Sequence, residues 1–334
     1  KPTDSFAGLK ALTVPFVSAG GGMEAWKFVT LAFCMMAGTA SLPHILMRYF
    51  TTPSVKSARR SVAWSLFFIF LLYFTAPALA TFTKLQILDP NLATGIIGKT
   101  IAEVNAIEWI QKWSAVKFLA ISDSNGDGIL QINEFFMRGD IVVLATPEIA
   151  GLPYVISGLV AAGGMAAAMS TADGLLLAIA NALSHDLYYK IIDPAAETAK
   201  RLIVARVLLV VLGAAGAFVA SLKLTSILGA VAWAFDFAMS GLFFPLVLGV
   251  WWKRANRQGA VAGMLCGFLA GTWYLYMVRW GGMEPWLGID HLRFGIIGCA
   301  VNLVVMIVVS LATEEPDEAT KKMVDEVRIP KGET

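Results

Sequence analysis

Long apolar runs separated by short polar connections dominate the chain. A helix needs roughly 20 apolar residues to cross a bilayer, and seven runs are about that long. They span residues 25–42, 62–82, 151–183, 202–222, 227–252, 260–278 and 294–311. Because lipid offers no partner to an unpaired backbone group, each run is expected to be a helix. The pattern predicts an all-α polytopic membrane protein.

The composition supports this fold class. Of 334 residues, 57% are hydrophobic and 15% are charged, whereas soluble proteins carry about 25% charged residues. The net charge of +2 gives no basic excess that would indicate a nucleic-acid partner. Cys34, Cys266 and Cys299 all fall in apolar runs, so we interpret them as small core residues and not as a disulfide framework.

The polar connections predict an orientation. Three of them carry groups of basic residues, namely Arg48, Lys56, Arg59, Arg60, Lys190, Lys200, Arg201, Lys253, Arg254 and Arg257. All three fall on one side, which the positive-inside rule makes cytoplasmic. The first residue is Lys and not Met, so we expect upstream sequence to be absent.

This orientation divides the chain into five parts. They are an external segment 1–24, two crossings in 25–82 with a cytoplasmic loop 43–61, an external domain 83–150, five crossings in 151–312, and a cytoplasmic tail 313–334. The tail is charged and contains Pro316 and Pro330, so we expect it to be solvated and partly disordered.

The predicted external domain is acidic and unusually long. It holds five basic and eight acidic residues, and 97–119 has the spacing of external helices. Residues 123–134 match the twelve-residue calcium loop D-x-[DN]-x-[DN]-G-x5-E at every fixed position. The predicted ligands are Asp123, Asn125, Asp127, Ile129 through its carbonyl, Gln131 and Glu134. An acidic turn without an ion is the alternative. We hypothesise an EF-hand-like insertion that bound Ca²⁺ stabilises.

The stretch 163–190 places hydroxyls within an apolar helix. Ser170 and Thr171 follow three alanines, and Asp173 lies two residues further on. Small neighbours let other helices approach, and hydroxyl and carbonyl oxygens are hard ligands suited to an alkali ion. The alternative is that both hydroxyls only bond back to the preceding turn.

Two further positions are candidates for substrate binding or coupling. Thr39 and Ser41 end the first run just before Pro43, where a broken helix is expected, as in the substrate sites of secondary carriers. Asp236 lies in mid-span, where an acid costs at least ~2.5 kcal/mol on insertion scales. Cation coordination, proton exchange or a structural pair with a basic residue each account for Asp236.

Catalytic chemistry is disfavoured, and the chain is not expected to be an enzyme. Ser184, His185 and Asp186 have the residue types of a triad, but adjacent residues do not build one. Three scattered histidines do not predict a zinc site. His185 and Asp186 are interpreted as capping a helix end near Tyr188 and Tyr189.

Four segments together resemble the sodium:solute symporter family. They are LPHILMRYFTTPSVKSARRS at 42–61, ATPEIAGLPYVISGLVAAGG at 145–164, AAAMSTADGLLL…SHDLYYK within 166–190, and FFPLVLGVWWKRANRQGAVAGMLCG at 243–267. The chain is most similar to bacterial acetate and short-chain monocarboxylate permeases. The sugar, proline and pantothenate branches fit less well.

The resemblance implies the second inverted repeat of the LeuT-like fold plus two trailing helices. It implies a sodium site at Ala167, Ser170 and Thr171, with the remaining ligands on a first helix that this chain lacks. Substrate contacts would come from 34–41 and from near Asp236. The implied partners are a small carboxylate solute, the N-terminal half of the transporter, the lipid bilayer and a small accessory membrane subunit. The implied location is the bacterial inner membrane.

Three functions follow as hypotheses. The first is sodium-coupled symport of a small carboxylate, with acetate or another short-chain monocarboxylate as the expected solute. The second is a proton-coupled carrier in which Asp236 or Asp173 exchanges the proton. The third is a symporter-like sensor or scaffold that does not transport and that carries the calcium loop.

Overall fold

The computed structural model describes residues 25–49, 51–222 and 224–328, so the predicted external segment 1–24 lies outside the described residues. The chain divides into two compact units. One contains Ser61–Ala172, and the other contains Met23–Arg60 and Asp173–Thr334. Each unit is described by itself below.

The described residues contain six helices long and apolar enough to cross a membrane, or seven if one bent pair counts as a single span. They are α4 (Val55–Leu88), α8 (Tyr154–Asn181) continued by the π-helical η3 (Ala182–Ile192), α9 (Thr198–Ser221), α10 (Ile227–Trp251), α11 (Arg257–Arg279) and α12 (Gly295–Ala312). Each predicted run overlaps one of these elements or the bent pair, and the ends differ by a few residues. The prediction of a helical polytopic membrane protein is therefore confirmed.

The bent pair is α2 (Ala25–Ser41) followed by α3 (Pro43–Tyr49), and the two helices meet at 48°. Proline has no backbone N–H to give to the preceding turn, and its ring clashes with that turn. Pro43 therefore begins a new helix after Leu42 instead of extending α2. The expected break in this run is confirmed.

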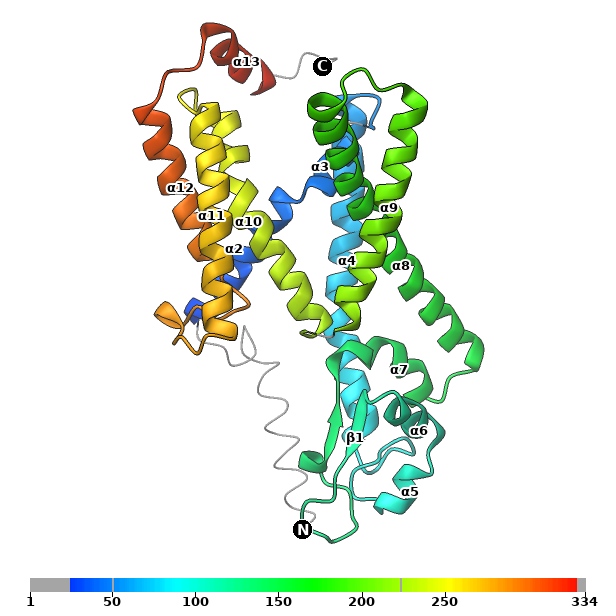
Figure 1. Ribbon diagram of the computed structural model, residues 1–334. Helices are drawn as coiled ribbons and strands as arrows, with labels where there is room; N and C mark the ends of the chain where they lie inside the picture. The colour runs from blue at the N-terminus through cyan, green and yellow to red at the C-terminus, as the bar shows by residue number, and fades with distance from the viewer. Residues whose placement is uncertain (1–24, 50, 223, 329–334) are drawn as a thin grey trace. The chain divides into compact units, whose positions relative to one another are not determined.

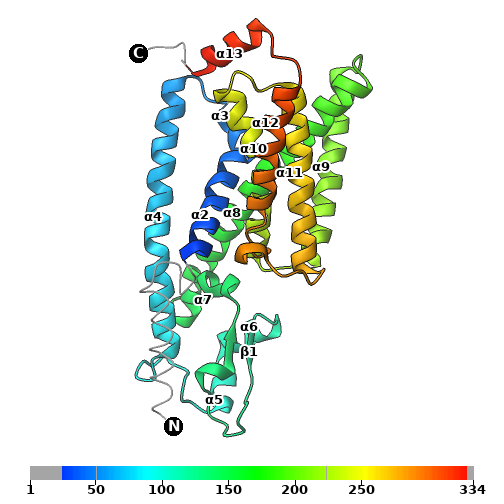
Figure 2. The same cartoon turned by 90° about the vertical axis from the view of Figure 1, so that its left-hand side faces the viewer.

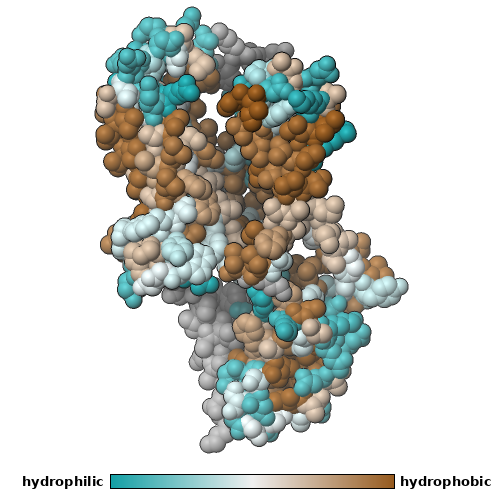
Figure 3. Space-filling model, viewed as in Figure 1, coloured by the Kyte–Doolittle hydropathy of each residue, from teal (hydrophilic) through white to brown (hydrophobic). Residues whose placement is uncertain are grey.

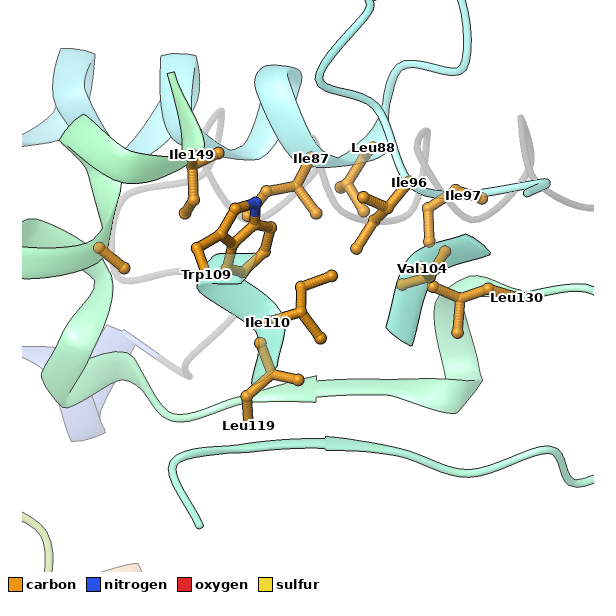
Figure 4. Close-up of a cluster of buried hydrophobic side chains, with 11 residues drawn as sticks. Ile87, Leu88, Ile96, Ile97, Val104, Trp109, Ile110, Leu119, Leu130 and Ile149 are labelled. Carbon is orange, nitrogen blue, oxygen red and sulfur yellow. The ribbon is translucent and has the colours of Figure 1, made fainter. Parts of the chain in front are cut away.

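The unit that contains 83–150 has a small hydrophobic core of its own. Its elements are α5 (Ile101–Asn105), α6 (Glu108–Ala115), β1 (Leu119–Ile121), η1 (Ile132–Glu134), β2 (Phe135–Met137), η2 (Gly139–Ile141) and α7 (Val142–Ile149). Strands β1 and β2 pair antiparallel, with Leu119 opposite Met137 and Ile121 opposite Phe135. Figure 4 shows Trp109 and Ile110 of α6 among side chains from the end of α4, from Leu130 and from α7. The end of α4 and the start of α8 are thus joined by a packed domain.

In the other unit, α2, α10, α11 and α12 lie side by side (Figures 1 and 2). Glycines allow this close approach. Gly259, Gly263, Gly267 and Gly271 recur every fourth residue along one face of α11, and all four are buried. A Cβ on Gly263 would lie 2.8 Å from Asn302 Oδ1 and 2.9 Å from Met306 Cβ of α12. The outward-facing surface of these helices is largely apolar (Figure 3), as expected for contact with lipid.

The described part of the tail contains an ordered helix, which differs from the expected partial disorder, whereas most of its side chains are exposed, as expected for a solvated segment. Residues Glu318–Arg328 form helix α13, which contacts α10. Arg328 donates from Nε to the Val250 carbonyl at 2.9 Å and from Nη2 to the Trp251 carbonyl at 3.2 Å. The last carbonyls of a helix have no partner within it, so Arg328 satisfies two of them at the end of α10. Lys253 adds an ion pair with Asp325 at 2.8 Å.

Candidate functional site

Three oxygen atoms gather on one face of α8. Ser170 Oγ donates to the Ala167 carbonyl at 3.0 Å, and Thr171 Oγ1 donates to the same carbonyl at 3.2 Å. The helix explains this cluster, because residues three and four apart lie on one face. The two donated hydrogen bonds leave the hydroxyl lone pairs free to accept or to ligate.

This arrangement fits both interpretations offered by the sequence. The back-bonding expected of helical Ser and Thr is present, and so is a cluster of three hard oxygens. All three residues are exposed on α8. An alkali ion needs further oxygens than these three, so the sodium site stays a prediction that requires ligands from outside this helix.

The hydroxyls at the α2 break bond within their own helix. Thr39 Oγ1 donates to the Met35 carbonyl at 2.7 Å, and Ser41 Oγ donates to the Ala37 carbonyl at 2.6 Å. Thr39 is exposed and Ser41 is buried. Of this pair, only Thr39 presents its hydroxyl where a solute can reach it without movement of the helix.

Helix α3 lies against α8 immediately after Asp173. A Cβ on Gly174 would lie 3.4 Å from Arg48 Nη2 and 3.8 Å from His44 Cβ. Asp173 itself is exposed. The structure therefore places the α2–α3 break beside the part of α8 that carries this acid, and both remain candidates for substrate binding.

Asp236 is enclosed completely. It has no exposed surface, and neither carboxylate oxygen has a hydrogen-bond partner among the described residues. A Cβ on Gly295, the first residue of α12, would lie 2.8 Å from Asp236 Oδ1 and 2.8 Å from Met239 Cε. The α12 glycine thus seals one side of the carboxyl, and solvent does not reach it in this arrangement.

A buried polar network lies one helical turn after Asp236 in α10. Ser240 Oγ donates to the Asp236 backbone carbonyl at 2.7 Å. Asn302 of α12 donates from Nδ2 to the carbonyls of Ser240 at 2.8 Å and Gly241 at 3.0 Å. Hydrogen bonds between polar side chains and backbone of different helices hold membrane bundles together. No sequence pattern indicates this role of Asn302, because its partners are backbone carbonyls of α10, some sixty residues earlier in the chain.

The calcium-loop motif forms a compact turn rich in oxygen. One carboxylate oxygen from each of Asp123, Asp127 and Glu134 lies within 4.8 Å of the other two. Gly126 and Gly128 adopt positive φ angles of 75° and 69°, which glycine tolerates and which close the turn. Donor atoms of this kind at this separation fit a hard divalent cation.

Backbone amides hold these carboxylates in place. Gly126 and Gly128 donate to the two oxygens of Asp123 at 2.7 and 3.1 Å. The Ile129 amide donates to Asp127 at 2.8 Å, and this bond lowers the pKa of the Asp127 carboxyl, with help from the side chains of Asn125 and Gln131. The Asn125 and Gln131 amides must turn their oxygens toward a cation in order to act as ligands.

Glu134 closes the loop as the motif requires. It is only 2% exposed, and its two oxygens accept from the amides of Ser124 at 2.9 Å and Gln131 at 3.0 Å. The elements on either side are β1 and the short η1 with β2. An EF-hand loop is flanked by two helices. In this structure the motif lies at the end of a β-hairpin instead.

The segment that pairs with the loop was not foreseen from the sequence. Leu130 donates its amide to the Lys99 carbonyl at 2.9 Å, and Gly98 donates to the Leu130 carbonyl at 2.9 Å. Ile101, the first residue of α5, donates to the Gly128 carbonyl at 2.9 Å. The loop is therefore tied by its backbone to the segment that precedes α5.

The Ser184–His185–Asp186 segment does not form a catalytic triad. His185 Nδ1 lies 3.0 Å from Asp186 Oδ1, and Lys190 Nζ lies 3.2 Å from the same oxygen. His185 also contacts the Tyr189 ring, over which Arg201 lies at 3.4 Å from the centroid. The exposed side chains of His185, Asp186 and Lys190 instead form a polar network within η3, whereas Ser184 is buried.

A match to a family model covers the part of the chain that carries most of the candidate sodium and substrate residues. Residues 141–267 match the model of the sodium:solute symporter family, and this range contains Ala167, Ser170, Thr171, Asp173 and Asp236. The resemblance stated from the sequence is thereby confirmed.

Two proteins similar to this chain are named as a symporter and a transporter. An uncharacterized symporter of Cupriavidus necator is 44% identical over 311 residues, which cover 90% of this chain and 44% of that protein. A monocarboxylic acid transporter of Corynebacterium glutamicum is 26% identical over 252 residues, which cover 75% of this chain and 38% of that protein. The chain thus spans less than half the length of the curated relatives it matches.

Proposed function

We propose that this chain forms part of a secondary transporter that couples solute uptake to sodium, because residues 141–267 match the model of the sodium:solute symporter family. The observation that carries the proposal is the convergence of Ala167, Ser170 and Thr171 on α8. Two hydroxyls and a carbonyl are ligands that replace part of the hydration shell of a sodium ion. Sodium is a transported substrate in this scheme.

The proposed solute is a short-chain monocarboxylate such as acetate. Support comes from the name of the Corynebacterium glutamicum relative, a monocarboxylic acid transporter. Broken helices line the substrate sites of secondary carriers, and the 48° bend after Ser41 provides one. Thr39 at this bend and Asp173 beside α3 are the proposed contacts with the solute or its coupling ion.

The test is radiolabelled acetate, propionate and pyruvate uptake into proteoliposomes that contain the complete transporter. We expect uptake of at least one of these acids to rise when a sodium gradient is directed inward. Uptake that is the same with sodium and with choline at equal ionic strength would contradict sodium coupling. Uptake of none of the three acids would contradict the proposed solute class.

The complete transporter requires partners for this chain. We propose that a further set of helices, in the same or a separate polypeptide, supplies the remaining sodium ligands and faces the exposed side of α8. A small accessory membrane subunit is a further proposed partner. The proposed location is the bacterial inner membrane, with the 83–150 domain outside and the C-terminus inside, because the basic connections lie on the opposite side from that domain.

The loop 123–134 is proposed to bind Ca²⁺ as a structural ion. Asp123, Asp127 and Glu134 supply convergent carboxylates, and the Ile129 carbonyl and the Asn125 and Gln131 side chains complete the motif. The ion would fix the loop against the Lys99 segment and so stabilise the domain between α4 and α8. This role differs from that of a sensor, which usually pairs two such loops.

A further inference from the structure

The Asp236 carboxyl is an exception among the polar groups of this protein. It is 0% exposed, and both of its oxygens lack a hydrogen-bond partner among the described residues. An ionised carboxylate in an apolar interior without hydrogen bonds is very costly, and such groups neutralise instead. A buried polar group without a partner therefore needs an explanation, which is an ion pair, a bound cation or a proton.

An ion pair does not account for it. The nearest basic side chain that influences Asp236 is Arg293. Arg293 already holds Asp290 through two hydrogen bonds, at 2.7 Å from Nη2 and 3.1 Å from Nε, and its Nη2 also donates to the Gly288 carbonyl at 3.0 Å. Its charge is thus matched by another acid, and its free Nη1 makes no hydrogen bond to Asp236.

A bound metal cation does not account for it either. The groups against the carboxyl are the Gly295 backbone, the Met239 methyl and the Cys34 thiol, which come from α12, α10 and α2. Ser240 directs its hydroxyl to the Asp236 backbone carbonyl. Alkali and alkaline-earth ions require several oxygen ligands, and the carboxyl has no second oxygen donor turned toward it.

The geometry points to Asp236 as a proton-binding site: it is a neutral carboxylic acid in this arrangement and releases its proton when α2 or α12 separates from α10. On release, the carboxyl O–H bond breaks, the proton passes to entering water and a carboxylate remains. The inference deepens the proposed transport function and rests on it for the consequence that proton release accompanies the conformational cycle.

Few charged groups lie near the carboxyl while the helices stay packed. The charged groups that act on Asp236 are Asp290 and Arg293, which form a pair with each other, and the titratable thiol beside it is Cys34 of α2. Cys299 of α12 is buried in the same hydrophobic cluster as Cys34. Gly38 of α2 and Gly295 of α12 bring their backbones against Phe235 and Asp236, so a small shift of either helix changes the access of water.

Infrared spectroscopy of the complete transporter in lipid at neutral pH tests the protonation directly and needs no transport. We expect a protonated carboxyl C=O band in the wild-type protein that disappears in Asp236→Asn and persists in Asp186→Asn. Asp186 is the matched control, because it is an exposed acid in another spanning segment and pairs with Lys190 at 3.2 Å. A wild-type minus Asp236→Asn difference that shows only carboxylate bands would overturn the proposal.

A second measurement covers the case in which Asp236→Asn does not fold. Wild-type protein labelled with ¹³C-aspartate is transferred to D₂O, and the shift of the protonated carboxyl band is followed. We expect at least one labelled band that exchanges slowly and that exchanges faster in Gly295→Ala, whose methyl group forces α12 away from Asp236. Absence of any protonated aspartate band at neutral pH would refute the assignment, whatever the outcome of the sodium uptake assay.

Discussion

Leu130 and Lys99 are joined by a backbone hydrogen bond of 2.9 Å between the amide of the first and the carbonyl of the second. Leu130 lies inside the calcium-loop motif, and its side chain is fully buried in the core shared with the end of α4. The loop therefore connects the proposed ion site with the hydrophobic core of the 83–150 domain. Any ligand that orders the loop should stabilise this core.

The first prediction is that Ca²⁺ raises the melting temperature of the 83–150 domain and that a chelator reverses the effect. At a free concentration about 100-fold above Kd, binding contributes about 2.7 kcal/mol to stability. Glu134→Gln removes the ligand that closes the loop and should abolish the response. Asp140→Asn, at a nearby acid outside the motif, should retain it. Equal melting curves with calcium and with chelator would contradict the calcium site.

The second prediction concerns the glycine face of α11. A Cβ on Gly267 would clash with the Ser240 carbonyl of α10 and lie 2.6 Å from Asn302 Cβ and 2.8 Å from the Gly298 carbonyl of α12. Overpacking of this kind costs about 1–3 kcal/mol. Gly267→Ala should lower the thermal stability of the purified protein accordingly. Gly249→Ala in α10, where no atom lies within 4 Å of the new methyl group, is the control and should leave stability unchanged.

The sequence predicted the membrane-spanning helices because apolar length alone determines them. It also predicted the α2 break from Pro43. The family resemblance named Ala167, Ser170 and Thr171, whose oxygens lie together because spacings of three and four residues are local to a helix. The two short strands β1 and β2 were missed because three-residue segments carry no periodic signal. The docking of α13 was missed because Arg328 binds carbonyls of α10, which no side-chain pattern reveals.

The surroundings of Asp236 likewise could not be predicted from the sequence. Its depth in an apolar run was evident, but three explanations stayed open because its neighbours come from α2 and α12. The pairing of Arg293 with Asp290 and the orientation of Ser240 toward a backbone carbonyl are the observations that favour proton binding among the three. Both facts depend on tertiary packing, which the order of residues alone does not reveal.

The third prediction is that the tail helix α13 detaches when its anchor is removed. Arg328→Ala deletes the two hydrogen bonds to the last carbonyls of α10. Amide hydrogen exchange in 318–328 should then become faster, while the spanning helices keep their protection. Lys322→Ala is the control, since Lys322 is an exposed residue of the same helix. Unchanged exchange in Arg328→Ala would show that the anchor contributes nothing.

The stability with which the tail helix docks should also depend on pH, and the Glu315 carboxyl determines whether it rises or falls. The hydrogen bond from Lys321, with the nearby charges of Lys321 and Arg254, holds the pKa of the Glu315 carboxyl below its usual value. A carboxyl with a lowered pKa stabilises the folded state above its unfolded pKa, and this contribution is lost as the pH falls through the folded value. The protection factors of the tail amides, which correct for the slower intrinsic exchange in acid, should therefore be high at neutral pH and fall in acid. Glu315→Gln should remove that acid-dependent step.

The last prediction separates a sodium ligand from an ordinary helical hydroxyl. Ser170→Ala and Thr171→Ala each remove one oxygen beside the Ala167 carbonyl. A contact with a charged group contributes about 1.5–3 kcal/mol, so the sodium concentration for half-maximal uptake should rise about tenfold or more in each variant.

Thr75→Ala provides the matched control for this experiment. Thr75 Oγ1 donates to the Leu71 carbonyl at 3.1 Å in α4, which is the same back-bonded geometry outside the proposed site. Its sodium dependence should equal that of the wild type. If all three variants shifted alike, the effect would belong to helix stability, and if none shifted, the hydroxyls of α8 would not bind the ion. Only a shift confined to Ser170 and Thr171 supports direct ligation.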